Sequence, residues 1–237
     1  MFPRETRLTF QDFIAYRMSG ITYDRGIQFS QDIGPIAATL GISNGNGISD
    51  EASLNSAGFN RPDHGFDNNR SKTFFGRIGG DVGPVAIGLF AASGKRSNAA
   101  DTTMIDSQVL GLDLSQSIND EIFWFAQYLQ VDWDDFLNKG ENASWSGGFA
   151  GVDYIYDSRW VFSALYNFAD ANDLEGSATV YEGIALNSLT AAVSYYFMRN
   201  AKMIIEANYD IQATDKRDGA GHDTKEHYLL TGFDVAF

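Results

Sequence analysis

The chain of 237 residues contains no cysteine. A disulfide framework, a thiolate metal site and a cysteine nucleophile are therefore all excluded. Basic residues are also scarce, because 17 Lys and Arg stand against 31 Asp and Glu and give a formal net charge of −14. Nucleic-acid binding depends on Lys and Arg, so this balance argues against a nucleic-acid partner.

Long apolar runs are missing as well. No stretch approaches the roughly 18–20 apolar residues that a transmembrane helix needs. The start, MFPRETRLTF, lacks the apolar core of a signal peptide. We therefore expect either that a targeting segment has been removed or that the chain is part of a longer one. The haem-attachment pattern C-x-x-C-H is absent too, and we predict no cofactor on this chain.

The sequence does contain many segments rich in β-forming residues, separated by two kinds of connection. Very short turns such as DIGPI (32–36) and DVGPV (81–85) alternate strictly with long polar connections such as 44–71 and 170–185. Outer-membrane barrels alternate short periplasmic turns with longer extracellular loops in this way, whereas nothing forces a soluble β-sandwich to do so. The predicted strands are 20–32, 34–44, 72–82, 84–94, 104–117, 120–133, 146–157, 159–169, 187–198, 200–212 and 225–237.

Most of these segments are longer than the usual soluble strand of about 5–6 residues and suit a tilted strand that crosses a membrane. Their two faces differ: in 200–212, Met203 and Ile205 alternate with Glu206 and Asn208. Apolar side chains toward lipid and polar ones toward a lumen would give this pattern. We predict an all-β, transmembrane, antiparallel up-and-down β-barrel with about 11 visible strands and 12–16 in the complete barrel.

The segment 120–133 carries aromatic residues on both faces, so its orientation is harder to assign. We place Phe123, Phe125, Leu129 and Val131 toward lipid. Aromatic residues also gather near strand ends, where they would form belts at the membrane interfaces or simply reflect the β-propensity of aromatics. The residues concerned are Tyr154, Tyr156, Trp160, Tyr195, Tyr196 and Phe197.

Two domains follow from this interpretation. Residues 19–237 form the barrel, and residues 1–18 form an N-terminal loop or helix, or an extra strand. Bacterial single-chain barrels have even strand numbers, so a strand at 5–18 would make twelve. That segment lacks clean alternation, and we prefer a loop or short helix with further strands upstream.

The N-terminal part resembles the phosphate-selective porin (O/P) family. The resemblance is carried by Arg25, Gly26 and Ile27 and by the stretch LGISNGNG (40–47), and it covers about a fifth of the chain. It implies the C-terminal part of a sixteen-stranded porin or a shortened relative of one. Phosphate selection in that family uses a ladder of Arg and Lys, which the predicted lumen face of this chain does not offer.

The polar face predicts the lining of a pore. Carboxylates dominate it, and rings of carboxylates favour cations. We therefore predict an outer-membrane porin-like channel of a Gram-negative bacterium for small hydrophilic solutes or ions, leaning toward cations. An alternative is a structural barrel that sheathes or docks a partner such as a multihaem cytochrome. The predicted pore-lining residues are Arg77, Asp81, Asp113, Asp153, Glu206, Asn208, Asp210, Glu226 and Asp234.

Enzymatic or metal chemistry is not expected. The histidines, His64, His222 and His227, share no motif with a serine, and the acidic loops lack the spacing of a calcium loop. The closing stretch YLLTGFDVAF instead resembles an assembly signal, carried by Phe233, Val235 and Phe237. The predicted partners are outer-membrane lipid and lipopolysaccharide, the barrel-assembly machinery, and either a homotrimer or a protein in the lumen.

Overall fold

The fold is taken from a computed structural model of the chain. It describes residues 26–44, 71–97, 104–135, 140, 142–171, 182–216, 222–223, 225 and 227–235. The segment 1–18 and nearly all of the connection 44–71 lie outside the described residues, as does 172–181. No described segment is a helix that is long and apolar enough to cross a membrane.

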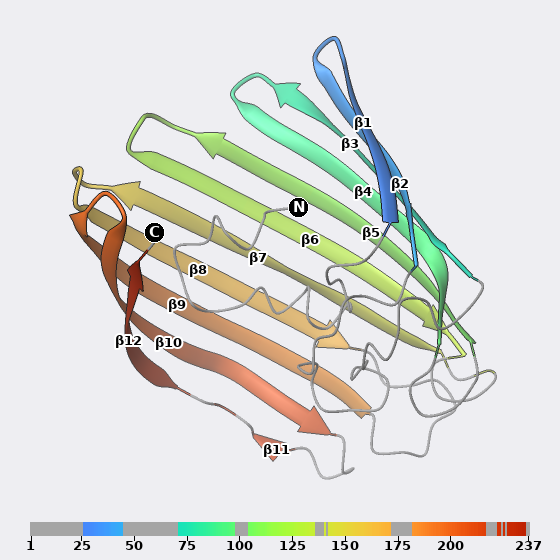
Figure 1. The fold of residues 1–237 in the computed structure, drawn as a ribbon. Coiled ribbons are helices and arrows are strands. Elements are labelled where there is room, and N and C mark those ends of the chain that lie inside the picture. Colours follow the sequence, from blue (N-terminus) through green and yellow to red (C-terminus); the bar gives the residue numbers. More distant parts are fainter. Residues whose placement is uncertain are drawn as a thin grey trace.

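The described residues form one antiparallel sheet in which strands follow one another in sequence order (Figure 1). At its C-terminal edge β12 pairs with β10, beside the short β11. This confirms the predicted all-β, up-and-down architecture. The strands are β1 (Gly26–Ile33), β2 (Ile36–Ser43), β3 (Thr73–Val82), β4 (Val85–Ser97), β5 (Met104–Ser117), β6 (Ile122–Asp134), β7 (Ala143–Ile155), β8 (Trp160–Ala171), β9 (Glu182–Met198), β10 (Ala201–Lys216), β11 (His222–Asp223) and β12 (Tyr228–Val235).

The predicted alternation of short turns and long connections is present. Gly34 and Gly83 begin two of the short turns with a φ of 63°, a conformation that glycine adopts without a Cβ penalty. Two other short turns are closed by side chains. Asn119 Oδ1 accepts hydrogen bonds from two backbone N–H groups, and Asp157 Oδ1 does the same. Because the strands run up and down in sequence order, all the short turns lie at the same end of the sheet, which we call the turn end.

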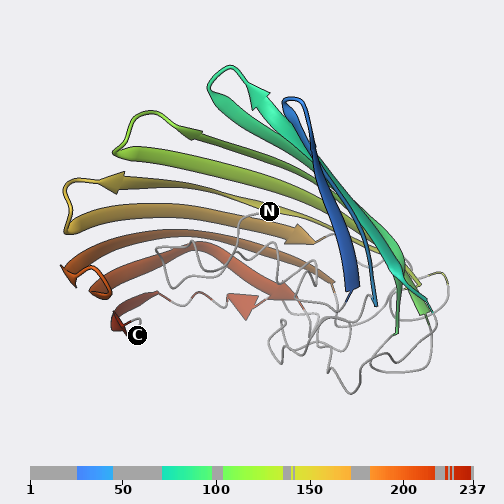
Figure 2. The same ribbon diagram turned by 45° about the horizontal axis from the view of Figure 1, so that its top comes forward.

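The sheet is curved and has two edges, β1 and β12, at opposite ends of the row of strands (Figures 1 and 2). Within the described sheet, β1 pairs with β2 alone and β12 with β10 alone. Both edge strands run toward the turn end, because an odd number of long strands connects them. Antiparallel closure of such a sheet requires an odd number of additional strands.

The two faces of the sheet have inverted polarity relative to a soluble protein. On one face large apolar side chains are exposed, such as Leu89 at 56%, Leu110 at 61% and Phe233 at 71%. On the other face polar side chains such as Asp113, Asn167 and Glu206 are buried. We call the face with the exposed apolar side chains the outer face and the face with the buried polar side chains the inner face. An apolar face of this extent needs lipid or a partner rather than water.

The apolar band on the outer face has the height of a membrane. On β9 it runs from Leu189 to Phe197, which is roughly 27 Å along the strand at about 3.4 Å per residue. Tilted by about 40°, this matches the apolar band of about 25 Å in membrane barrels once the flanking rings are added. On the side away from the turns, a polar rim ends the band. It consists of Ser93, Gln108, Gln130, Ser146, Asp170, Asn187 and Gln212.

Aromatic side chains gather at both borders of this band. Near the turn end, Trp160 packs on Tyr195 with ring centroids 4.6 Å apart, and Tyr195 on Phe197 at 5.0 Å. At the polar rim, the Tyr166 hydroxyl donates to Asn187 over 3.0 Å. Such rings sit at headgroup level, with the ring in the apolar layer and the hydroxyl in the polar one.

One of the aromatic residues grouped near this strand end does not belong to the belt. Tyr196 lies on the inner face opposite Lys202, whose ammonium is 5.8 Å from its ring centroid. The reason is the strict alternation of β9, in which neighbouring residues point to opposite faces.

Candidate functional site on the inner face

Cross-strand pairing decides which predicted pore-lining residues share a face. The pairing register places every predicted pore-lining residue that the structure describes on the inner face: Arg77, Asp81, Asp113, Asp153, Glu206, Asn208, Asp210 and Asp234. Glu226 and Phe237 lie outside the described residues. Phe233 and Val235 lie on the outer face and are exposed. Their part in assembly stays a prediction.

The main charged contact of the inner face joins Arg77 on β3 to Asp113 on β5. Arg77 Nη2 lies 2.5 Å from Asp113 Oδ1, and Arg77 Nε donates to Oδ2 over 3.2 Å. This is a two-point pairing of guanidinium with carboxylate, the arrangement that fixes both groups in orientation as well as in distance. The Asp113 side chain is 8% exposed and that of Arg77 34%, so the arginine is the more exposed partner of the pair.

Glycine makes room for this pair. Arg77 reaches across β4, where Gly88 lies directly opposite both Asp113 and Gly79. A Cβ at Gly88 would overlap with the guanidinium and with the carboxylate, and a Cβ at Gly79 would lie 3.0 Å from Arg77 Nη1. The arginine can therefore lie flat on the wall because two neighbouring strands carry no side chain there.

A second polar group spans β9, β10 and β12. Thr190 Oγ1 donates to Asn208 Oδ1 over 2.9 Å, and Asn208 Nδ2 donates to Asp210 Oδ1 over 2.7 Å. Tyr228 Oη donates to the buried Glu206 over 2.8 Å. Buried polar groups need such partners, because each one left unsatisfied costs free energy. The result is a fixed polar strip along this side of the inner face.

Asp153 stands apart from that strip, on β7 toward the turn end. It accepts a hydrogen bond from the Ser163 hydroxyl directly opposite on β8, over 2.7 Å. The donor is neutral, so it leaves the carboxylate charge in place.

Lys202 is an inner-face cation that sequence reasoning missed. Its Nζ lies 3.5 Å from Asp234 Oδ2 across the β10–β12 pair. Its place could have been found, because it shares parity with Glu206 on the same strand. Both described basic side chains of the inner face, Arg77 and Lys202, therefore contact a carboxylate.

The inner face of β6 to β8 is more apolar than expected. The outward placement of Phe123, Phe125, Leu129 and Val131 was wrong, because Gln127 pairs with Asp113 and sets their parity toward the inner face. Leu129 and Val131 are each 1% exposed. Tyr128, which lies between Gln127 and Leu129 in the sequence, points outward instead. The apolar group on this wall consists of Phe125, Leu129, Val131, Trp133, Trp145, Phe149 and Leu165.

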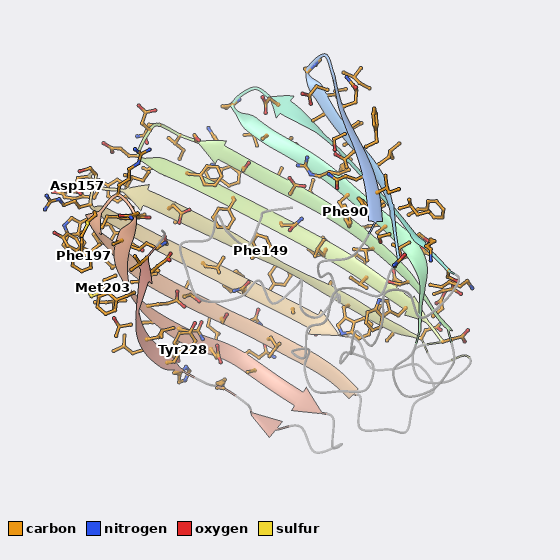
Figure 3. All side chains as sticks on the ribbon, viewed as in Figure 1. Phe90, Phe149, Asp157, Phe197, Met203 and Tyr228 are labelled. Carbon is orange, nitrogen blue, oxygen red and sulfur yellow. The ribbon has the colours of Figure 1, made fainter. Side chains whose placement is uncertain are left out.

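Figure 3 shows Phe149 over the middle of the sheet, on β7. Its ring packs edge-on against Phe125 at a centroid distance of 6.1 Å, and it contacts Leu165 within the same cluster. Trp133 and Trp145 pack at 4.6 Å nearer the polar rim. The inner face therefore has an apolar part on β6 to β8, and the parts on both sides of it carry charged side chains.

Carboxylates outnumber cations on the inner face. Among its described side chains are seven carboxylates, Asp32, Asp81, Asp113, Asp153, Glu206, Asp210 and Asp234, and two basic groups, Arg77 and Lys202. No group of three or more metal-ligating side chains gathers among the described residues. The arrangement is spread along the wall, as in a lining, and not focused on one reacting atom.

No protein-family model matches the chain, and neither does any curated protein sequence. The resemblance to the phosphate-selective porin family therefore stays a prediction.

Solved structures do match. OmpT of the Vibrio cholerae outer membrane superposes on 97% of this chain with a TM-score of 0.63 and 13% identity. A refined porin structure superposes on all of it with a TM-score of 0.60 and 11% identity, and an anion-selective porin from Comamonas acidovorans on 90% with a TM-score of 0.56 and 11% identity.

This chain spans 70%, 66% and 58% of those three chains, respectively. At such identity the likeness concerns the fold, and the anion selectivity of one neighbour belongs to that neighbour. The chain has the fold of outer-membrane porins, an antiparallel up-and-down β-barrel wall.

Proposed function

We propose that this chain forms most of the wall of an outer-membrane channel in a Gram-negative bacterium, through which small hydrophilic solutes or ions diffuse passively. The observation that carries the proposal is the inverted polarity of one sheet, which has an apolar band exposed on the outer face and charged and polar side chains on both sides of an apolar group on the inner face. Lipid solvates the first face and water the second. The fold shared with porins supports the same conclusion.

Additional strands complete the barrel in this proposal. Unpaired backbone groups at the open edges of β1 and β12 would each cost several kcal/mol in lipid. The parallel direction of the two edges supports a total of 12, 14 or 16 strands.

We infer further that the channel leans toward cations. Among the inner-face side chains that the structure describes, there are seven carboxylates and two basic groups, and both basic groups contact a carboxylate. The potential inside is then negative, which attracts cations and repels phosphate and other anions. Homotrimers are a reasonable assembly for this fold, since OmpT of Vibrio cholerae has been studied in a trimer form.

Single-channel recording on the purified protein tests the proposal. Reconstituted into planar bilayers, it should give discrete conductance steps, with a reversal potential in a KCl gradient that reports cation preference. Absence of steps from protein that is folded, as judged by heat-modifiable gel migration, would contradict an open channel.

The same result would favour the second candidate, a barrel that encloses a partner protein. The apolar group of the inner face, from Phe125 to Leu165, is the observation behind that candidate. Co-purification of a stoichiometric protein, haem-stained if it is a cytochrome, would then be expected.

A further inference from the structure

We propose that Asp113 controls the ion selectivity of the channel by cancelling the charge of Arg77. The inference rests on the proposed channel function and deepens it. In this inference one ion pair, which lies over Gly88, keeps the β3–β5 part of the inner face from attracting anions.

The geometry presents the pair to the lumen as a neutral unit. Two hydrogen bonds join the guanidinium to the carboxylate, and the carboxylate is the less exposed group, at 8% against 34% for Arg77. A passing ion is therefore more exposed to Arg77 than to Asp113. Without Asp113 beside it, Arg77 would present a full positive charge to that ion.

The pair lies where an uncancelled charge would act most strongly. Ile78, Leu89 and Leu112 form one cross-strand row on the outer face of β3, β4 and β5, in the middle of the apolar band. The wall behind the pair is therefore apolar and borders lipid. Charges in low-dielectric surroundings are screened less by salt than charges at an open surface.

Gly88 is what keeps the two charges together. A side chain there would occupy the space of both groups, so alanine would separate them without changing the net charge. The displaced Arg77 would move toward the lumen, since it is the more exposed partner. The effect of the Arg77–Asp113 contact can thus be tested separately from the effect of a change in net charge.

The test is the reversal potential of the protein in planar bilayers under a KCl gradient. Asp113→Asn should lower the cation-to-anion permeability ratio roughly threefold or more, the size expected of one uncancelled unit charge within a Debye length of the ion path. Gly88→Ala should shift the ratio in the same direction.

Two variants serve as matched controls. Asp106→Asn breaks an ion pair with Lys95 of 2.9 Å on the outer face, so it removes the same charge outside the lumen. Gly111→Ala adds a methyl group on β5 against Leu129 and leaves the pair intact. Neither should shift the permeability ratio by more than the error of the measurement.

The outcomes separate the inference from the proposed function. A wild-type protein without conductance overturns the channel, whereas a conducting Asp113→Asn variant with unchanged selectivity overturns the role of the pair. Equal shifts in Asp113→Asn and Asp106→Asn also overturn it. If Asp113→Asn does not assemble, Gly88→Ala decides alone, because unchanged selectivity there means that pairing has no effect.

Discussion

The assignment of the outer face makes a depth-dependent prediction for β4. Leu89 is exposed, lies in the middle of the apolar band, and has Ile78 and Leu112 as its cross-strand neighbours. Leu89→Arg would place a charge at the level of the bilayer centre. Ser93 lies on the same face of the same strand, two outward positions further toward the rim, and provides a matched site for the same substitution.

The magnitude follows from position. An arginine on the lipid face of a barrel costs about 2–4 kcal/mol at the midplane and about 0–1 kcal/mol near the interface. Leu89→Arg should therefore lower the folding equilibrium constant roughly 30- to 1,000-fold, and Ser93→Arg less than about fivefold. Ala92→Arg on the inner face should also cost little, since its side chain points into water.

The assay is reversible unfolding in guanidinium with lipid vesicles present, followed by tryptophan fluorescence. The free energy of unfolding of the three variants is compared with that of the unmodified protein. Equal losses for Leu89→Arg and Ser93→Arg would refute the placement of the apolar band. A larger loss for Ala92→Arg than for Leu89→Arg would show that the two faces have been exchanged.

Two further substitutions and one deletion test the turn geometry, the buried polar strip and the assembly signal. Gly83→Ala should lower the free energy of unfolding by about 1–2 kcal/mol, because a φ of 63° is unfavourable for a residue with a Cβ; an unchanged unfolding midpoint in denaturant would contradict the turn geometry. Tyr228→Phe removes the hydroxyl that donates to the buried Glu206 and should cost about 1.5–3 kcal/mol in the same assay, whereas Tyr209→Phe, on the outer face, should cost less. Deletion of Phe237 should reduce the amount of folded barrel in the outer membrane more than it changes single-channel conductance, with Phe237→Tyr as a control; normal assembly without an aromatic terminus would argue against the signal.

Much of the fold could be predicted from the sequence, because apolar and polar residues alternate along a membrane strand with a period of two. In β10, Met203 and Ile205 alternate with Glu206 and Asn208, and in the structure the first pair lies outward and the second inward. Turn residues were equally informative. The glycines of DIGPI and DVGPV mark where the chain reverses, and both have positive φ.

Alternation failed in β6, where both faces are apolar or aromatic. Within the strand, the sequence does not show which of Leu129 and Tyr128 faces lipid. The face of each residue could be assigned only from the pairing register with Asp113 on the neighbouring strand. Long-range pairing of this kind is not visible in one strand's sequence.

The candidate site was predicted as a set of residues but not as a set of contacts. Six of the seven described inner-face carboxylates were predicted from parity, and Asp32 was missed. The Arg77–Asp113 pair could not be found, since its partners are 36 residues apart and meet only because Gly88 lies between them. Lys202 was overlooked although its parity was available.

The absence of cysteine allows the central claim, that one face of this sheet meets lipid and the other water, to be measured directly. Single cysteines at 85, 86, 87, 89, 90, 91 and 92 of β4 can carry a nitroxide label in vesicles, and its collisions with oxygen and with a water-soluble nickel complex can be compared. Labels at 85, 87, 89 and 91 should collide mainly with oxygen, and those at 86, 90 and 92 mainly with nickel. Collision rates without a period of two, or with the two sets reversed, would contradict the central claim.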